Sequence, residues 1–362
     1  MENNNEKKNL LQRNEISKST GKNMKTRIIS ALVLFLICFP IALVGSYPFF
    51  ILIFILAIFS TYEMIKVPKQ KKLPLLLWIA LVTITIAFIY WPFVKNCIGG
   101  KDVITQSFVD GVTINKMFEI GFASEKGYAS LLMATPIIGI AFIVLFLTTI
   151  SDETFTIKDV FYYFGMAIVF GLGFQSFYYL RYLPFAVAPD LYYDNGVYEY
   201  LASSLLFIYV VIGTMITDIG AYFFGVFFGK HKMNPRVSPK KTWEGFFGGI
   251  AVSVVVSTAF VFICDAAGCP VLPGILDIEH FYWVLLLSVA MPIIGNLGDL
   301  AFSAIKRDYD VKDYSNIIPG HGGVLDRFDS VMLVAPTLCL INALINLCSG
   351  VYILWLMSQL QF

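Results

Sequence analysis

The sequence predicts an all-α, polytopic integral membrane protein with about nine transmembrane helices. Hydrophobic residues make up 57% of its 362 residues, against roughly 45–50% in an average soluble domain. Charged residues contribute only 14% and are concentrated in short segments between long apolar runs. A soluble fold of this length could not cover so much apolar surface, because its exterior must still meet water.

A membrane-spanning helix needs about 20 mostly apolar residues. The runs that meet this requirement predict helices over 27–46, 48–65, 73–94, 129–150, 160–180, 201–228, 246–264, 281–304 and 331–357. Only the turn Gly45–Pro48 separates the first two runs, so we expect them to form a tight hairpin. The last run is long enough to break near Ser349–Gly350.

Lys and Arg are unevenly distributed between the predicted loops. With the N-terminus in the cytosol, the inside segments hold 21 of the 26 Lys and Arg residues. The outside segments hold the other five, Lys95, Lys101, Lys116, Lys126 and Arg181. Because cytosolic loops carry an excess of cations, this count predicts a multi-pass protein of the cell membrane with a cytosolic N-terminus.

The predicted helices divide the chain into three parts. Residues 1–26 form a polar tail, which we expect to be flexible and cytosolic, and residues 27–200 form N-terminal transmembrane helices with external loops. Residues 201–362 form a C-terminal transmembrane catalytic region with cytosolic loops at 229–245 and 305–330. A net charge of +1 argues against nucleic acid as a partner.

The first of these cytosolic loops is basic, with five cations in 12 residues. One interpretation is that these cations only satisfy the positive-inside rule. The other is that they bind a polyphosphate, since hydroxyls and backbone N–H groups beside cations complete phosphate contacts. The candidate ligands of this loop are Ser238, Lys240, Lys241 and Thr242.

The second cytosolic loop groups glycines, cations and carboxylates. Asp326 and Asp329 are three residues apart, so at the start of a helix they share one face with Cβ atoms ~5–6 Å apart. Gly322 and Gly323 allow the backbone to approach a ligand closely. His321 stands between glycines, where a hydrogen bond to phosphate or backbone is favoured over a metal bond. Carboxylates beside cations in a Gly-rich turn are suited to metal-bound phosphates.

Two further aspartates, Asp218 and Asp299, fall inside predicted spans. An Asp at the bilayer centre costs about 2.5–3.5 kcal/mol on insertion scales. At the helical rise, Asp218 lies ~18 Å from Lys230 and Asp299 lies ~10 Å from Lys306. Either aspartate could be a structural residue bonded to a neighbouring helix. Together with the carboxylates of the adjoining loop, they predict a site in a cavity that opens to the cytosol.

The second loop and the helix end before it resemble a known signature. The matching segments are Ser303 to Arg307, Lys312–Asp313 and Pro319 to Asp329. They resemble the phosphatidate cytidylyltransferase (CDP-diacylglycerol synthase) family. Asp218 to Phe223 and Ser238 to Gly245 are similar to the same family. The start of the apolar chain, Lys25 to Ala31, looks like the bacterial members.

The resemblance implies an all-helical membrane enzyme that transfers the cytidylyl group of CTP to phosphatidate and releases pyrophosphate. It also implies magnesium, with potassium as a second cation, and places the active site at the cytosolic face beside membrane lipid. Asp299 and Asp326 then match the metal-binding aspartates, with Asp329 and Asp218 next in line. The residues that match positions around the phosphates are Ser303, Lys306, Arg307, Lys312, Asp313 and Arg327.

Several alternatives stay open from the sequence. The nearest is a related lipid enzyme, either a CTP-dependent lipid or polyprenol kinase or a cytidylyltransferase for an ether lipid. A transporter with Asp218 and Asp299 as ion ligands is an alternative from another class, but the inverted repeats typical of transporters are not visible. The oligomeric state is open as well, with a homodimer among the alternatives.

Overall fold

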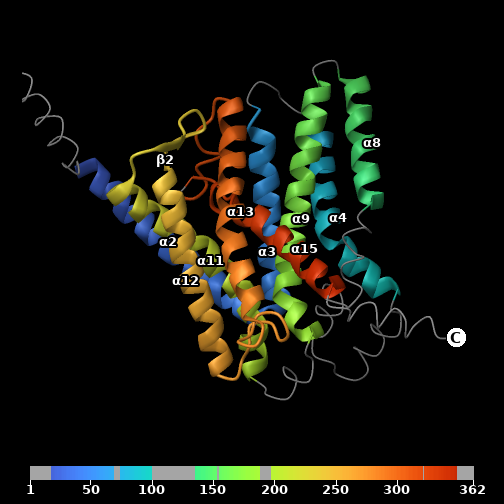
Figure 1. Cartoon of the computed structure of the whole chain (residues 1–362). Helices are drawn as coiled ribbons and strands as arrows, with labels where there is room; N and C mark the ends of the chain where they lie inside the picture. The colour runs from blue at the N-terminus through green and yellow to red at the C-terminus, as the bar shows by residue number, and fades with distance from the viewer. Residues whose placement is uncertain are drawn as a thin grey trace, which may run out of the picture.

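The computed structural model describes residues 18–68, 74–99, 135–152, 155–187, 197–320 and 322–348, and these form an all-α fold (Figure 1). The helices are α2 (Lys18–Val44), α3 (Ser46–Lys66), α4 (Leu75–Gly99), α8 (Thr135–Ser151), α9 (Ile157–Val187), α11 (Val197–Phe228), α12 (Trp243–Ala266), α13 (Phe281–Asp308), α14 (Leu325–Phe328) and α15 (Val331–Cys348). Two short strands, β1 (Lys232–Asn234) and β2 (Ser238–Thr242), form an antiparallel hairpin between α11 and α12.

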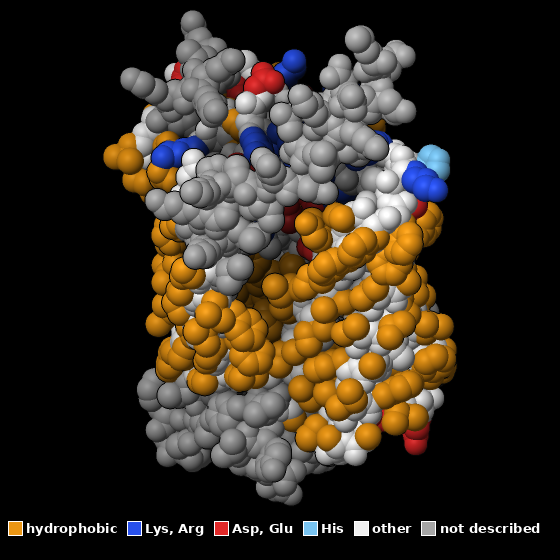
Figure 2. All heavy atoms as spheres, turned by 90° about the vertical axis from the view of Figure 1, so that its left-hand side faces the viewer, with side chains coloured by type: hydrophobic (Ala, Val, Ile, Leu, Met, Phe, Trp, Pro, Cys, Tyr) orange, Lys and Arg blue, Asp and Glu red, His pale blue; other side chains and the backbone are white. Residues whose placement is uncertain are grey.

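Each predicted apolar segment overlaps one of the long helices. Five helices, α3, α9, α11, α12 and α13, are long and apolar enough to cross a membrane, and α2, α4, α8 and α15 contain shorter apolar stretches. Figure 2 shows hydrophobic side chains in a broad band around the middle of the molecule, with most charged side chains toward one end. The all-α, polytopic membrane fold is therefore confirmed, whereas the number of crossings and their orientation stay predictions. The predicted break near Ser349–Gly350 lies outside the described residues.

The expected hairpin between the first two helices is present, and a buried arginine supports it. Gly45 turns the chain with φ of 68°, a conformation that glycine adopts without steric cost. Arg181 donates from Nε to the carbonyl of Ala42 and from Nη2 to that of Leu43, at 2.8 Å each. The guanidinium therefore satisfies carbonyls at the C-terminal end of α2, which lack partners within the helix.

The prediction that Arg181 lies in a connection after the helix is wrong, whereas its side of the membrane stays a prediction. Helix α9 continues to Val187, and Arg181 is only 1% exposed. The sequence suggested a helix end at residue 180 because a cation follows a long apolar run there. In the fold the carbonyls of α2 replace water around this cation, so the helix continues past it.

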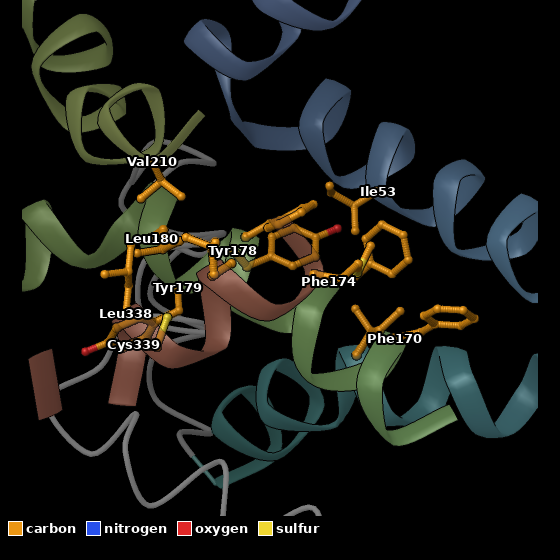
Figure 3. Packing of buried hydrophobic residues seen from close by; sticks show 14 of the residues in the cluster. Ile53, Phe170, Phe174, Tyr178, Tyr179, Leu180, Val210, Leu338 and Cys339 are labelled. Atoms are coloured by element: carbon orange, nitrogen blue, oxygen red, sulfur yellow. The ribbon is translucent and has the colours of Figure 1, made fainter. Parts of the chain in front are cut away.

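Helix α9 lies at the centre of the bundle and packs against α3, α4, α11 and α15. Figure 3 shows its buried aromatic side chains, Phe170, Phe174 and Tyr178, beside residues of α3 and α15. The Tyr178 hydroxyl lies 2.9 Å from that of Tyr90 on α4. The Phe49 and Tyr178 rings meet edge to face with their centroids 5.4 Å apart, an arrangement that aromatic pairs prefer. This core holds the N-terminal helices against the C-terminal region.

Helices α11 and α12 approach each other closely because glycines lie in the first two turns of α12 on the face that meets α11. A Cβ on Gly245 would lie 2.7 Å from the Ala221 carbonyl, and one on Gly249 would lie 2.8 Å from the Thr217 carbonyl. Small residues of this kind allow membrane helices to pack backbone to backbone. The β-hairpin between these helices and the segment 309–320 lie at the same end of the bundle (Figure 1).

Candidate active site

Three aspartates from three different elements come together at this end of the bundle. Asp218 of α11 is exposed and interacts electrostatically with Asp299 of α13 and with Lys241 and Arg327. Asp329, directly after α14, interacts electrostatically with both Asp299 and Asp218. Figure 2 shows acidic side chains in a recess, between the hydrophobic band and the Lys and Arg side chains nearer the end of the molecule. The predicted association of the intramembrane aspartates with the second loop is thus observed.

The negative charges of this cluster repel one another. Burial raises the pKa of Asp329 to about 7, and the charge of Asp299 adds to the rise, while Lys306 opposes it. Asp299 is stabilised by an ion pair with Lys241, 2.7 Å between Oδ2 and Nζ, and by a hydrogen bond from the Ser303 hydroxyl at 3.1 Å. A cation bound beside these carboxylates would offset their repulsion and favour the ionised form of Asp329.

Asp326 has different partners from the other three aspartates. Its carboxylate accepts from Lys306 Nζ at 2.7 Å and from the backbone N–H groups of Tyr314 and Gly323, both at 2.9 Å. Both charged side chains are buried, with 4% of Asp326 and 9% of Lys306 exposed. A buried ion pair is tolerated when further hydrogen bonds satisfy its atoms. Asp326 therefore anchors the loop, in addition to the metal-binding role implied by the resemblance.

The carboxylate oxygens of this site are the donors that Mg²⁺ prefers. Asp218, Asp299 and Asp329 carry such oxygens and interact electrostatically with one another. Even so, in the described parts of the chain no three Asp, Glu, His or Cys side chains converge closely enough to hold a metal ion as they stand. The predicted ligation of magnesium by Asp299, Asp326, Asp329 and Asp218 therefore stays a prediction.

The β-hairpin brings the first cytosolic loop onto α13. Lys241, on β2, reaches Asp299 and also donates to Asn296 Oδ1 at 3.2 Å. Arg307, at the end of α13, donates from Nε to the Val237 carbonyl at 3.3 Å and from Nη1 to the Val311 carbonyl at 3.1 Å. The two basic segments predicted from the sequence therefore form one surface.

Among the other predicted substrate residues, the structure separates exposed from buried ones. Thr242 is buried and caps α12, where its hydroxyl oxygen accepts from the Gly245 N–H at 3.2 Å. The half-buried Ser238 lies on β2. The exposed residues are Lys240, Lys312, Asp313 and Arg327. His321 lies outside the described residues.

Packing inside the protein also requires glycine at two positions of the second loop, in addition to the predicted close approach to a ligand. Gly322 has φ of +89°, and a Cβ there would lie 2.9 Å from Asp326 Oδ2. A Cβ on Gly323 would lie 2.6 Å from Glu63 Oε2. The space beside these glycines is thus occupied by carboxylates of the protein itself.

Sequence reasoning missed two polar residues beside this site. Glu63 of α3 is completely buried, and its carboxylate accepts hydrogen bonds from Ser315, Val324 and Leu325. Asn296 of α13 is 4% exposed and orients Lys241. Glu63 had a detectable signal, since an acidic residue at the end of an apolar run is costly in a membrane unless it has partners.

Comparison with known proteins identifies the family of this chain. The model of the cytidylyltransferase family matches residues 25–345. The chain belongs to the cytidylyltransferase family. It is 33% identical over 324 residues to a phosphatidate cytidylyltransferase of Bacillus subtilis, covering 90% of this chain and 99% of that protein. It is 31% identical over 316 residues to a phosphatidate cytidylyltransferase of Staphylococcus epidermidis, covering 87% of this chain and 97% of that protein.

The cytidylyltransferase match extends over both halves of the bundle. It begins within α2 and ends within α15, so it includes α3 with Glu63 as well as the cluster of aspartates. A phosphatidate cytidylyltransferase of Staphylococcus aureus is 29% identical over 317 residues, which cover 87% of this chain and 97% of that protein. The similarity is therefore a property of the whole fold as well as of the signature loop.

Proposed function

We propose that the protein is a phosphatidate cytidylyltransferase, a nucleotidyltransferase that converts CTP and phosphatidate to CDP-diacylglycerol and pyrophosphate in phospholipid biosynthesis. The observation that carries this proposal is the convergence of the basic hairpin and the acidic cluster at the Lys241–Asp299 ion pair. Relatives with this name match nearly their entire length, 99% in Bacillus subtilis and 97% in Staphylococcus epidermidis.

The location of the site suits a reaction between a lipid and a nucleotide. The acidic recess borders the hydrophobic band of the molecule (Figure 2). The acyl chains of phosphatidate can therefore stay among apolar side chains while its phosphate reaches the charged residues. CTP enters from the aqueous side, which the distribution of Lys and Arg predicts to be the cytosol.

The reaction needs no nucleophile from the protein. An ionised phosphate oxygen of phosphatidate attacks the α-phosphorus of CTP, and the bond from that phosphorus to the oxygen bridging to the β-phosphate breaks. Pyrophosphate leaves with the electron pair of the broken bond. The protein contributes position and complementary charge, as in other phosphoryl-group transfers. Lys241, Arg307, Lys312 and Arg327 are the cations that we assign to the phosphates.

The acidic residues have two separate tasks in this proposal. Asp218, Asp299 and Asp329 would hold magnesium, which would supply positive charge to the phosphate oxygens. Asp326 keeps Lys306 and the loop backbone in place and remains a predicted ligand. Potassium is the second cation implied by the resemblance. The Lys241–Asp299 ion pair keeps the hairpin beside this acidic group in the structure described here.

An assay with labelled CTP tests the function. Purified protein is incubated with phosphatidate, magnesium and CTP labelled at the α-phosphate, and the label is followed into a chloroform-soluble product. We expect magnesium-dependent transfer that is lost in Asp299→Asn. Transfer of a γ-phosphate label would instead identify a CTP-dependent kinase. A strong preference for ether-linked phosphatidate would identify an ether-lipid enzyme, and no transfer from either position would contradict both classes of enzyme.

A further inference from the structure

A carboxylate from the N-terminal half of the chain accepts hydrogen bonds from the second loop, the segment that resembles the family signature. Glu63 Oε1 accepts from the Ser315 hydroxyl at 2.6 Å and from the Val324 N–H at 2.8 Å. Its Oε2 accepts from the Leu325 N–H at 2.8 Å. Glu63 is 0% exposed. We infer that Glu63 is a positioning residue for the cytidylyl transfer proposed above, on which this inference rests.

The contacts of Glu63 and Asp326 alternate along the same backbone. The consecutive N–H groups of residues 323, 324 and 325 donate to Asp326 Oδ2, Glu63 Oε1 and Glu63 Oε2 respectively. In the earlier part of the loop, the Tyr314 N–H donates to Asp326 and the Ser315 hydroxyl donates to Glu63. A shift of the backbone away from Glu63 would therefore also disturb Asp326, and with it Lys306.

Gly323 and Glu63 are sterically matched. A Cβ on Gly323 would lie 2.6 Å from Oε2 and 2.7 Å from Oε1 of Glu63. These distances are too short for any side chain, and a carboxylate held by three donors cannot move away without losing them. The absence of a side chain at position 323 is thus required by a residue of α3, far away in the sequence.

The bonds of Glu63 also identify the kind of role it plays. Three donors occupy its two oxygens inside the protein, so it is not placed to take a proton from substrate. Burying a carboxylate is costly unless hydrogen bonds compensate. Here those bonds are used to fix the loop that carries Asp326, one residue after the segment that Glu63 holds. The effect of Glu63 on catalysis is therefore expected to be indirect, through the position of the loop.

Glu63→Gln is the main test. With its oxygen in the Oε1 position the amide still accepts from Ser315 and Val324, but its NH₂ then faces the Leu325 N–H; in the opposite orientation only the Leu325 bond survives. We expect kcat for cytidylyl transfer to fall about 10- to 100-fold with the KM for CTP changed less than about threefold, because misplacement acts mainly in the transition state. Hydrogen–deuterium exchange at residues 324 and 325 should become faster. Thr61→Val, at a buried position of α3 whose hydroxyl bonds only within the helix, is the matched control.

A second variant pair tests the contact itself. Gly323→Ala places a methyl group against the carboxylate and should abolish turnover. In a Glu63→Asp background the carboxylate is withdrawn by one methylene, about 1.5 Å on the bond lengths of the chain, so the same Gly323→Ala change should cost at least tenfold less. Such rescue between a helix position and a loop position far apart in the sequence arises from direct contact and not from a general loss of stability.

The inference is overturned if Glu63→Gln keeps wild-type kcat or leaves exchange at 324 and 325 unchanged. It is also overturned if the loss of kcat disappears when activity is expressed per folded protein, or if the Glu63 and Gly323 effects are additive. If the wild-type protein transfers no cytidylyl group, the proposed function fails instead. The exchange measurement still shows in that case whether Glu63 holds the loop.

Discussion

Lys241, on strand β2, lies 2.7 Å from Asp299 of α13, and this ion pair joins the two basic segments of the chain into one site. Asn296, one helical turn before Asp299, also accepts a hydrogen bond from the same ammonium group. Lys241, which the proposed reaction also needs, thus joins Arg307 in holding the hairpin to α13. Substrate binding and the position of the hairpin are therefore expected to depend on the same residue.

Lys241→Gln should raise the KM for CTP about tenfold, equivalent to roughly 1.4 kcal/mol, because a charge-assisted contact to phosphate is lost. Lys241→Arg should recover part of this loss. Steady-state kinetics at saturating phosphatidate make the comparison. Lys232→Gln, an exposed cation on β1, serves as the control for general loss of charge, and an equal effect of that change would contradict a specific role for Lys241.

Asp326→Asn should reduce both turnover and stability, whereas Asp299→Asn should reduce turnover with little loss of stability. The difference follows from burial, since Lys306 would lose the carboxylate with which it pairs in a buried environment. Breaking a buried pair by removing one partner typically costs 3–5 kcal/mol. Thermal unfolding in detergent measures the stabilities, and the α-label assay measures turnover. Equal melting temperatures for the two variants would contradict the anchoring role of Asp326.

Asp329 makes the stability of the metal-free protein dependent on pH. Its pKa is raised from 3.8 to about 7 in the folded protein. Between these values the folded state keeps a proton that the unfolded state has released, so stability from this group is present below pH 3.8 and is lost as pH rises through about 7. Asp329→Asn should therefore be more stable than wild type at pH 8 and similar near pH 4.

Thermal unfolding of both proteins at the two pH values, with a chelator present, checks this prediction. Added magnesium should stabilise the wild type more than Asp329→Asn, because a bound cation favours the ionised carboxylate. The same variant should be nearly inactive in the labelled-CTP assay. If the difference in stability between the wild type and Asp329→Asn is the same at pH 4 and at pH 8, the raised pKa of Asp329 is contradicted.

Gly45→Ala tests the turn between α2 and α3, away from the site. Alanine is strained at φ of 68°, and its methyl group would lie 2.9 Å from the Arg181 guanidinium. A residue with a Cβ in this conformation costs about 1–2 kcal/mol before any clash. We expect a lower melting temperature with unchanged kcat per folded protein. A loss of kcat without a change in stability would show that this turn acts on the site directly.

The apolar runs and local motifs were enough to predict the fold class and most residues of the candidate site. A run of about 20 apolar residues is a local property of the sequence. In lipid such a segment satisfies its own backbone hydrogen bonds as an α-helix, so each predicted span overlaps a helix. The site residues lie in two short segments, and their charge, spacing and resemblance to a known signature are also local properties. For this reason Asp299, Lys306, Asp326 and Asp329 could be named before the fold was known.

Tertiary structure decided which of these residues act on one another. Asp326 and Asp329 are neighbours in sequence, yet the first pairs with Lys306 and the second interacts with Asp299 and Asp218. Glu63 joins the site from a helix more than 250 residues earlier, and Arg181 is buried against carbonyls of α2. These partners are brought together only when distant helices pack, and the free energy of a charge in a membrane protein depends on such partners more than on its neighbours in the sequence.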